Sequence, residues 1–167
     1  MKIGIVFGCF IPLHSGHKYL IDQASKDNDI VIIGVCGKDN DRGKDFIPFR
    51  DRIELMKKLY TLPKYIVVPV DDEKLKLDGS FSHDNWVIWG KELFSNANIN
   101  PDNIYAQFTW YTGEPSYTEK LSNIYKCHKF VTFDRPKNGV SGTKIRQNLE
   151  DNKQCVNEIF LEYLKNK

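Results

Sequence analysis

Short apolar runs alternate with amphipathic segments along this chain of 167 residues, and this alternation most constrains its fold. The apolar runs have the length of strands and are rich in Val and Ile, at 2–8, 30–36, 65–70, 104–108 and 129–133. The segments between them repeat their apolar residues with helical spacing, at 17–26, 50–60, 86–94 and 115–125. Two further helices are expected after Ser141. The pattern therefore predicts strands that are each followed by a helix.

Strands separated by helices are typical of βαβ units with right-handed crossovers and a parallel sheet. We predict an α/β fold: a Rossmann-like, doubly wound, five-stranded parallel sheet with helices on both faces and C-terminal helices. No linker rich in Pro, Gly or Ser divides the chain, so residues 1–167 are expected to form a single domain. Ligands of such folds bind beyond the carboxyl ends of the strands, here from Gly8, Gly37, Asp71, Gln107 and Asp134 onward.

The charge balance and the hydropathy pattern exclude several classes of protein. Lys and Arg total 24, Asp and Glu total 22, and the net charge of +2 argues against charge-driven binding to nucleic acid or to a membrane surface. No apolar run approaches the roughly 18 residues of a membrane span, and the N-terminus lacks the long apolar region of a signal peptide. The four cysteines include no CxxC pair, so we expect reduced thiols and a cytoplasmic protein.

The loop after the first predicted strand reads GCFIPLHSGH and has the features of a phosphate site. Gly8 allows the backbone to approach a ligand closely, and Ser15 is the predicted N-cap of the next helix. Amide groups at that helix start favour anions, and Gly16 leaves space beside them. His14 and His17 are spaced to reach the same side and to donate to phosphate oxygens. The alternatives are a capping or packing role, or a metal pair, for which no third ligand is apparent.

A second polar segment, VSGTKIR, opens a late helix. Ser141 is its predicted N-cap, and Thr143 adds a hydroxyl group at the helix start. Arg146 lies one turn further in, and an arginine can grip a phosphate through two parallel hydrogen bonds. The alternative is a capped surface helix that faces solvent.

Together the two segments carry a resemblance to a known family. GCFIPLHSGH resembles the G-x-F-x-P-x-H-x-G-H signature of the nucleotidyltransferase superfamily of adenylyl- and cytidylyltransferases, and VSGTKIR resembles its second hallmark. The resemblance implies that His14, His17 and Arg146 are catalytic and bind the phosphates of ATP, which enters with Mg²⁺. It further implies an ATP site formed by Gly8, Cys9, Phe10, His14, Gly16, His17, Ser141, Thr143 and Arg146.

Smaller matches indicate the acceptor. The segment HDNWVIW resembles the Trp-x-x-Trp helix of nicotinamide mononucleotide (NMN) adenylyltransferases. This implies that Trp86 stacks on the nicotinamide ring with Asn85 beside it, while Trp89 is expected in the core. Arg52 matches the family's arginine at the start of the second helix, and Asp39 lies in the preceding loop. The resemblance implies that both residues, with Trp86 and Asn85, bind NMN. The alternatives are a core role for Trp86 and a solvated charge run around Asp39.

The implied reaction is ATP + NMN → NAD + pyrophosphate. The whole chain resembles the adenylyltransferase domain of bifunctional NMN adenylyltransferase/ribosylnicotinamide kinase proteins and is expected to stand alone. Residues 108–111 look like a short insertion, which leaves Trp110, Tyr111 and Glu114 without assigned roles. Alternatives are another phosphorylated acceptor, such as phosphopantetheine or glycerol 3-phosphate, and a catalytically silent nucleotide sensor. Members of the superfamily often assemble, so a homo-oligomer is compatible with the sequence.

Overall fold

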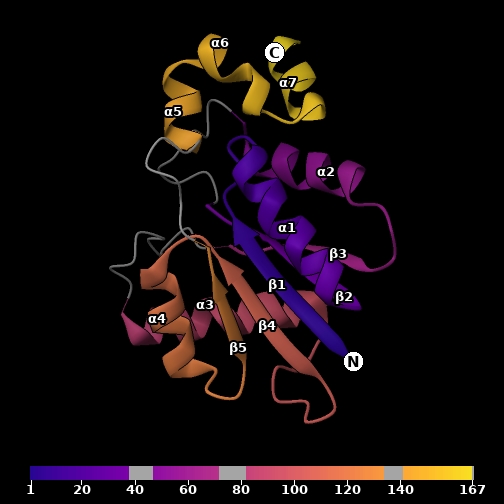
Figure 1. Ribbon diagram of the computed structural model, residues 1–167, viewed down its shortest axis with the longest axis vertical. Coiled ribbons are helices and arrows are strands. Elements are labelled where there is room, and N and C mark those ends of the chain that lie inside the picture. Colours follow the sequence, from indigo (N-terminus) through magenta and orange to yellow (C-terminus); the bar gives the residue numbers. More distant parts are fainter. Residues whose placement is uncertain (38–46, 72–81, 134–140, 167) are drawn as a thin grey trace.

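A five-stranded, all-parallel sheet forms the centre of the molecule (Figure 1). The structure is a computed structural model that describes residues 1–37, 47–71, 82–133 and 141–166. Its strands are β1 (Lys2–Gly8), β2 (Ile30–Val35), β3 (Tyr65–Pro69), β4 (Gln107–Thr112) and β5 (Lys129–Thr132). They lie in the order β3-β2-β1-β4-β5, which places β1 in the middle of the sheet. The predicted doubly wound α/β fold is confirmed.

Helices cover both faces of this sheet and bury a separate core on each (Figure 1). The helices that follow the first four strands are α1 (Ser15–Asp27), α2 (Phe49–Leu59), α3 (His83–Ala97) and α4 (Pro115–Ile124). Neighbouring strand residues point to opposite faces, so Val6 enters the core under α1 and α2, and Ile5 enters the core under α3 and α4. We call these the first core and the second core.

The C-terminal segment lies beyond the carboxyl ends of the strands and packs against α2 (Figure 1). It comprises α5 (Gly142–Gln147), α6 (Leu149–Asn152), the 3₁₀ turn η1 (Lys153–Cys155) and α7 (Glu158–Lys165). Phe160 of α7 is fully buried in the first core. The amide of Asn157 donates to the carbonyl of Leu13 over 3.1 Å, and Val156 forms an antiparallel bridge with His14. The C-terminal segment therefore holds the loop that carries His14.

The fourth strand is the element that the sequence misplaced. It spans Gln107–Thr112, whereas the prediction was 104–108, and its carboxyl end follows Thr112 and not Gln107. Ile104 and Tyr105 are 85% and 83% exposed, because they belong to a turn in which the side chain of Asn103 accepts a hydrogen bond from the amide of Tyr105. The residues of the predicted insertion at 108–111 lie within the strand itself, where they pair with β1 and β5.

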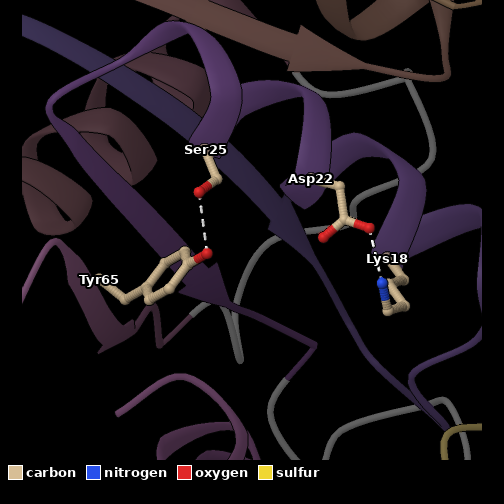
Figure 2. A network of polar contacts seen from close by, with 4 residues as sticks. All are labelled: Lys18, Asp22, Ser25 and Tyr65. Atoms are coloured by element: carbon tan, nitrogen blue, oxygen red, sulfur yellow. Dashed lines mark hydrogen bonds and ion pairs between the residues drawn. The ribbon is translucent and has the colours of Figure 1, made fainter. Parts of the chain in front are cut away.

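Polar contacts connect the C-terminal half of α1 to the sheet (Figure 2). The hydroxyl of Tyr65 on β3 donates to Oγ of Ser25 over 2.9 Å, and the ammonium of Lys64 donates to the Ser25 carbonyl. Nearer the helix start, Lys18 forms an ion pair of 2.6 Å with Asp22 on the exposed face. None of the described helices combines the length and the apolarity that crossing a membrane requires.

Candidate active site

Two stacked histidines form the start of α1. His14, not the predicted Ser15, is the N-cap, and its Nδ1 accepts a hydrogen bond from the amide of Gly16 over 3.1 Å. In return, Nδ1 of His17 accepts a hydrogen bond from the amide of His14 over 3.4 Å. The two rings stack with centroids 3.7 Å apart and planes 21° apart. Imidazole nitrogens thus take the part that Ser and Glu side chains play in an ordinary capping box.

This capping geometry fixes the chemistry of both rings. A neutral imidazole that accepts a hydrogen bond at Nδ1 carries its proton on Nε2, so each ring is a donor at Nε2. Phe10 is fully buried and packs edge-on against His17, with ring centroids 4.8 Å apart. The capping role and the predicted phosphate role are therefore compatible, because capping orients the donors.

A cleft opens at the carboxyl ends of β1 and β4, next to these histidines. One side consists of the start of α1 and the start of α5, and the other consists of the end of β4 and the start of α4. Most of the predicted ATP-binding residues line it: Gly8, Cys9, Phe10, His14, His17, Ser141, Thr143 and Arg146. Gly16 does not line the cleft, although its amide donates the hydrogen bond that the His14 cap accepts. The fold thus brings together the two segments that the sequence singled out.

Arg146 connects those two segments through hydrogen bonds. Its Nη1 donates to the carbonyl of Ile11 over 2.9 Å, and its Nη2 donates to Oγ1 of Thr143 over 3.3 Å. Ser141 is the N-cap of α5, as predicted, and its Oγ accepts from the amide of Lys144. A Cβ atom on Gly142 would lie 2.9 Å from Nη1 of Arg146 and 3.3 Å from the Ile11 carbonyl oxygen. A side chain at position 142 would therefore displace the Arg146 guanidinium from this arrangement.

Arg52 is fully buried and holds the loops behind the cleft. Its guanidinium donates to four backbone carbonyls at distances of 2.7 to 3.0 Å, those of Cys9, Cys36, Gly37 and Ile47. These carbonyls belong to the segments after β1 and β2 and to the segment before α2. Arg52 itself does not line the cleft. Its direct contact with NMN stays a prediction, while the described contacts are those of a residue that positions Cys9 and Cys36.

Trp86 lies below the cleft and not in its wall. The indole is fully buried in the second core, with ring centroids 5.3 Å from Trp89 and 5.5 Å from Tyr117. Tyr117 and Phe7 line the cleft, and both pack against the Trp86 indole. This geometry matches the core alternative, and the stacking of nicotinamide on Trp86 stays a prediction.

Asn85 and Asp39 are the other two residues predicted to bind NMN. Asn85 is half-buried in the first turn of α3, where its amide donates to Oγ of Ser82, the N-cap of the helix. It does not line the cleft. Asp39 lies outside the described residues.

The α4 side of the cleft is lined by Thr112, Gly113, Glu114 and Tyr117, residues to which the sequence had assigned no site role. The signal was present, because Gly113 and Glu114 directly follow Thr112, the last residue of a parallel strand. The misplaced boundary of β4 concealed it. Cys36, at the end of β2, was missed as a lining residue as well. No group of three His, Cys, Asp or Glu side chains comes together to hold a metal ion within the described ranges.

Comparisons with known proteins agree with this site. Residues 5–148 match the family model described as Cytidylyltransferase-like. The trifunctional NAD biosynthesis/regulator protein NadR of Escherichia coli (strain K12) is 28% identical over 157 residues, which are 87% of this chain and 36% of NadR. A Fusobacterium nucleatum protein named "Probable nicotinate-nucleotide adenylyltransferase" is 30% identical over 142 residues, which are 81% of this chain and 68% of that protein.

Solved structures show the same relationship. A crystal structure of NadR in complex with NR matches with a TM-score of 0.76 at 28% identity, over 95% of this chain and 44% of that chain. A second, of NadR in complex with NAD and AMP-PNP, gives 0.72 at 26% identity, over 95% and 45%. This chain therefore spans less than half the length of the NadR proteins.

The region matched by the family model runs from within β1 to just past the end of α5 and so includes both segments that form the cleft. The resemblance that the sequence suggested is confirmed. The chain belongs to the cytidylyltransferase-like family of nucleotidyltransferases and is related to the NMN and nicotinate-nucleotide adenylyltransferases.

Proposed function

We propose that this chain is a nicotinamide-nucleotide adenylyltransferase, which transfers AMP from ATP to NMN and yields NAD and pyrophosphate. The observation that carries the proposal is the cleft in which His14, His17 and Arg146 meet at the carboxyl end of β1. The similarity to NadR, whose solved structure holds NAD and AMP-PNP, supports the choice of donor and acceptor.

In the proposed reaction, a phosphate oxygen of NMN attacks the α-phosphorus of ATP. A new oxygen–phosphorus bond forms, and the bond between that phosphorus and the oxygen bridging to the β-phosphate breaks. The attacking oxygen is already anionic, so the protein need not supply a nucleophile. Catalysis then depends on positioning the reactants and on stabilising the charge that develops on the leaving pyrophosphate.

The described residues are suited to that task. His14 and His17 would donate from Nε2 to the phosphate oxygens, because Nδ1 of each ring already accepts a backbone hydrogen bond. Arg146 would add a positive charge beside the leaving group, together with the hydroxyl groups of Ser141 and Thr143. Mg²⁺ would enter with ATP and bind mainly through the phosphates, since this ion needs few protein ligands when phosphates are present.

The acceptor part of the site is proposed on the α3 and α4 side. Trp86 would stack on nicotinamide only if the ring that is now fully buried became accessible. Tyr117 and Phe7 line the cleft above it and provide aromatic surface for a flat, cationic pyridinium ring.

Product analysis by chromatography tests the proposal. Purified protein is incubated with ATP, Mg²⁺ and either NMN, nicotinic acid mononucleotide or phosphopantetheine. We expect NAD from NMN, and a decrease of about 10²- to 10³-fold in kcat for His17→Ala, because that variant lacks one pre-oriented donor. Lys26→Ala is the control, since Lys26 is exposed at the far end of α1.

Each outcome has a distinct meaning. Turnover of phosphopantetheine or nicotinic acid mononucleotide without turnover of NMN would support adenylyl transfer but refute NMN as its acceptor. Binding of ATP or NAD without turnover of any acceptor would support a nucleotide sensor instead. Full activity of His17→Ala would refute the role of that histidine.

A further inference from the structure

The two sides of the cleft differ in charge. His14, His17 and Arg146 come from α1 and α5, which pack on the first core. The opposite side comes from the end of β4 and the start of α4, and Glu114 is the one acidic side chain among the described residues that line the cleft. In the proposed reaction, the phosphates lie on the basic side. The α4 side is therefore the side that faces the uncharged or cationic part of a nucleotide.

Hydrogen bonds fix Glu114 at this position. It is the N-cap of α4, and its carbonyl accepts hydrogen bonds from the amides of Tyr117 and Thr118. Thr112 at the end of β4 connects to the same turn, because its hydroxyl bonds to the Thr118 hydroxyl over 2.7 Å. That hydroxyl in turn bonds to the hydroxyl of Thr132 on β5, also over 2.7 Å. The start of α4 is thus tied to two strands.

The carboxylate of Glu114 keeps most of its capacity to accept hydrogen bonds. Within the described part of the chain, its Oε1 accepts one hydrogen bond, from Oγ of Ser116 over 3.2 Å, and no basic side chain forms an ion pair with it. An ionised carboxyl group has about four acceptor positions and no donor. Beside it, the ring of Tyr117 packs against Phe7 and Trp86 and provides a flat aromatic surface.

We propose that Glu114 is a specificity-determining residue, which selects a base carrying an exocyclic amino or amide N–H₂ group and rejects a base with a carboxylate or carbonyl oxygen at that position. The proposal rests on the proposed function and deepens it. Two substrates carry such a group: NMN on its carboxamide, and ATP on its adenine. A carboxylate in the cleft would accept a hydrogen bond from either, and it would repel the carboxylate of nicotinic acid mononucleotide or the carbonyl oxygen of hypoxanthine.

The test compares Glu114→Gln with the wild-type protein in two arms. The acceptor arm measures the ratio of kcat/KM for NMN to that for nicotinic acid mononucleotide. The donor arm measures the ratio of binding affinities for ATP and ITP by calorimetry, which requires no turnover. Glu119→Gln is the matched control, because Glu119 is an exposed residue of the same helix. Thermal unfolding of each variant monitors its fold.

We expect Glu114→Gln to reduce one of the two ratios by about tenfold, because the neutral amide accepts less strongly and no longer repels an anion. A change in the acceptor arm identifies the carboxamide as the selected group, and a change in the donor arm identifies adenine. Unchanged ratios in both arms overturn the proposal. A uniform loss of rate that excess Mg²⁺ restores also overturns it, since Glu114 would then be a metal ligand.

The two proposals can fail separately. If the wild-type protein turns over neither mononucleotide, the proposed function fails, and the donor arm alone decides the role of Glu114. If NAD forms but neither ratio changes in Glu114→Gln, the function stands and the specificity role is wrong.

Discussion

His14 and His17 show how one pair of side chains can serve both the helix and the chemistry. Each Nδ1 accepts a backbone hydrogen bond at the start of α1, so each ring directs its Nε2 donor in a fixed orientation. The stacking of the rings at 3.7 Å restricts their rotation further. The sequence suggested donors at this position, but the identity of the N-cap depended on the conformation of the loop.

Arg52 yields a prediction that separates structure from substrate binding. Arg52→Met would leave four carbonyls, two of them in buried and two in partly buried hydrogen bonds, without this donor, and we expect it to lower the free energy of unfolding by about 3 kcal/mol. Urea unfolding of the variant and the wild type measures this difference. Normal stability combined with a raised KM for NMN alone would show instead that Arg52 contacts the acceptor.

His128 predicts a dependence of stability on pH. Burial is the main reason that the pKa of His128 is lowered from its ordinary value of 6.5. The neutral ring is bound at both nitrogens, because Nδ1 accepts from Nε1 of Trp110 over 3.0 Å and Nε2 bonds to the carbonyl of Pro101 over 2.8 Å. Protonation of Nδ1 would remove the acceptor to which Nε1 of Trp110 donates.

The unfolded chain therefore takes up this proton at a higher pH than the folded chain does. The contribution of His128 to stability is complete above about pH 6.5 and is lost as the pH falls through the lowered pKa of the folded state. Unfolding free energies at pH 7.5 and 5.5 should differ more for the wild type than for His128→Phe. An equal pH dependence of both proteins would contradict this.

At the scale of elements, α5 completes the site by docking on the loop after β1. Gly142→Ala would place a Cβ atom against Nη1 of Arg146 and the Ile11 carbonyl, so the guanidinium must shift. We expect kcat to decrease about tenfold or more, with a small change in thermal stability, because Arg146 would no longer face the leaving group correctly. Steady-state kinetics measures the effect.

The control for this variant is Gln147→Ala, because Gln147 is exposed at the end of α5. If Gly142→Ala and Gln147→Ala had the same kcat as the wild type, the position of Arg146 would not matter for turnover.

Element boundaries and burial mark the limit of what the sequence could predict. The strand at 2–8 and the capped helix after Ser141 depend on local residue patterns, and both were predicted correctly. β4 was displaced because apolar Ile104 and Tyr105 precede it in an exposed turn. The burial of Trp86 results from packing against Phe7 and Tyr117, which lie far from it in the chain, so its local pattern could not reveal it.

At the scale of the whole molecule, the order of strands explains why the site lies where it does. β1 is central, and β4 and β2 pair with it on either side, so the segments after these three strands meet at one edge. The C-terminal segment then returns over this edge, where Val156 bridges to His14 and Arg146 reaches the Ile11 carbonyl. The alternation of strands and helices predicted this architecture, but it could not predict how the C-terminal segment docks.

The central claim is that this cleft transfers AMP directly from ATP to the phosphate of NMN. The most direct measurement is to incubate the protein with Mg²⁺, NMN and ATP labelled at either the α- or the γ-phosphorus, and to follow the label. We predict that the α-label appears in NAD and the γ-label in pyrophosphate, in equal amounts and without labelled protein. An α-label that remains in ATP, or that becomes attached to the protein, would contradict the claim.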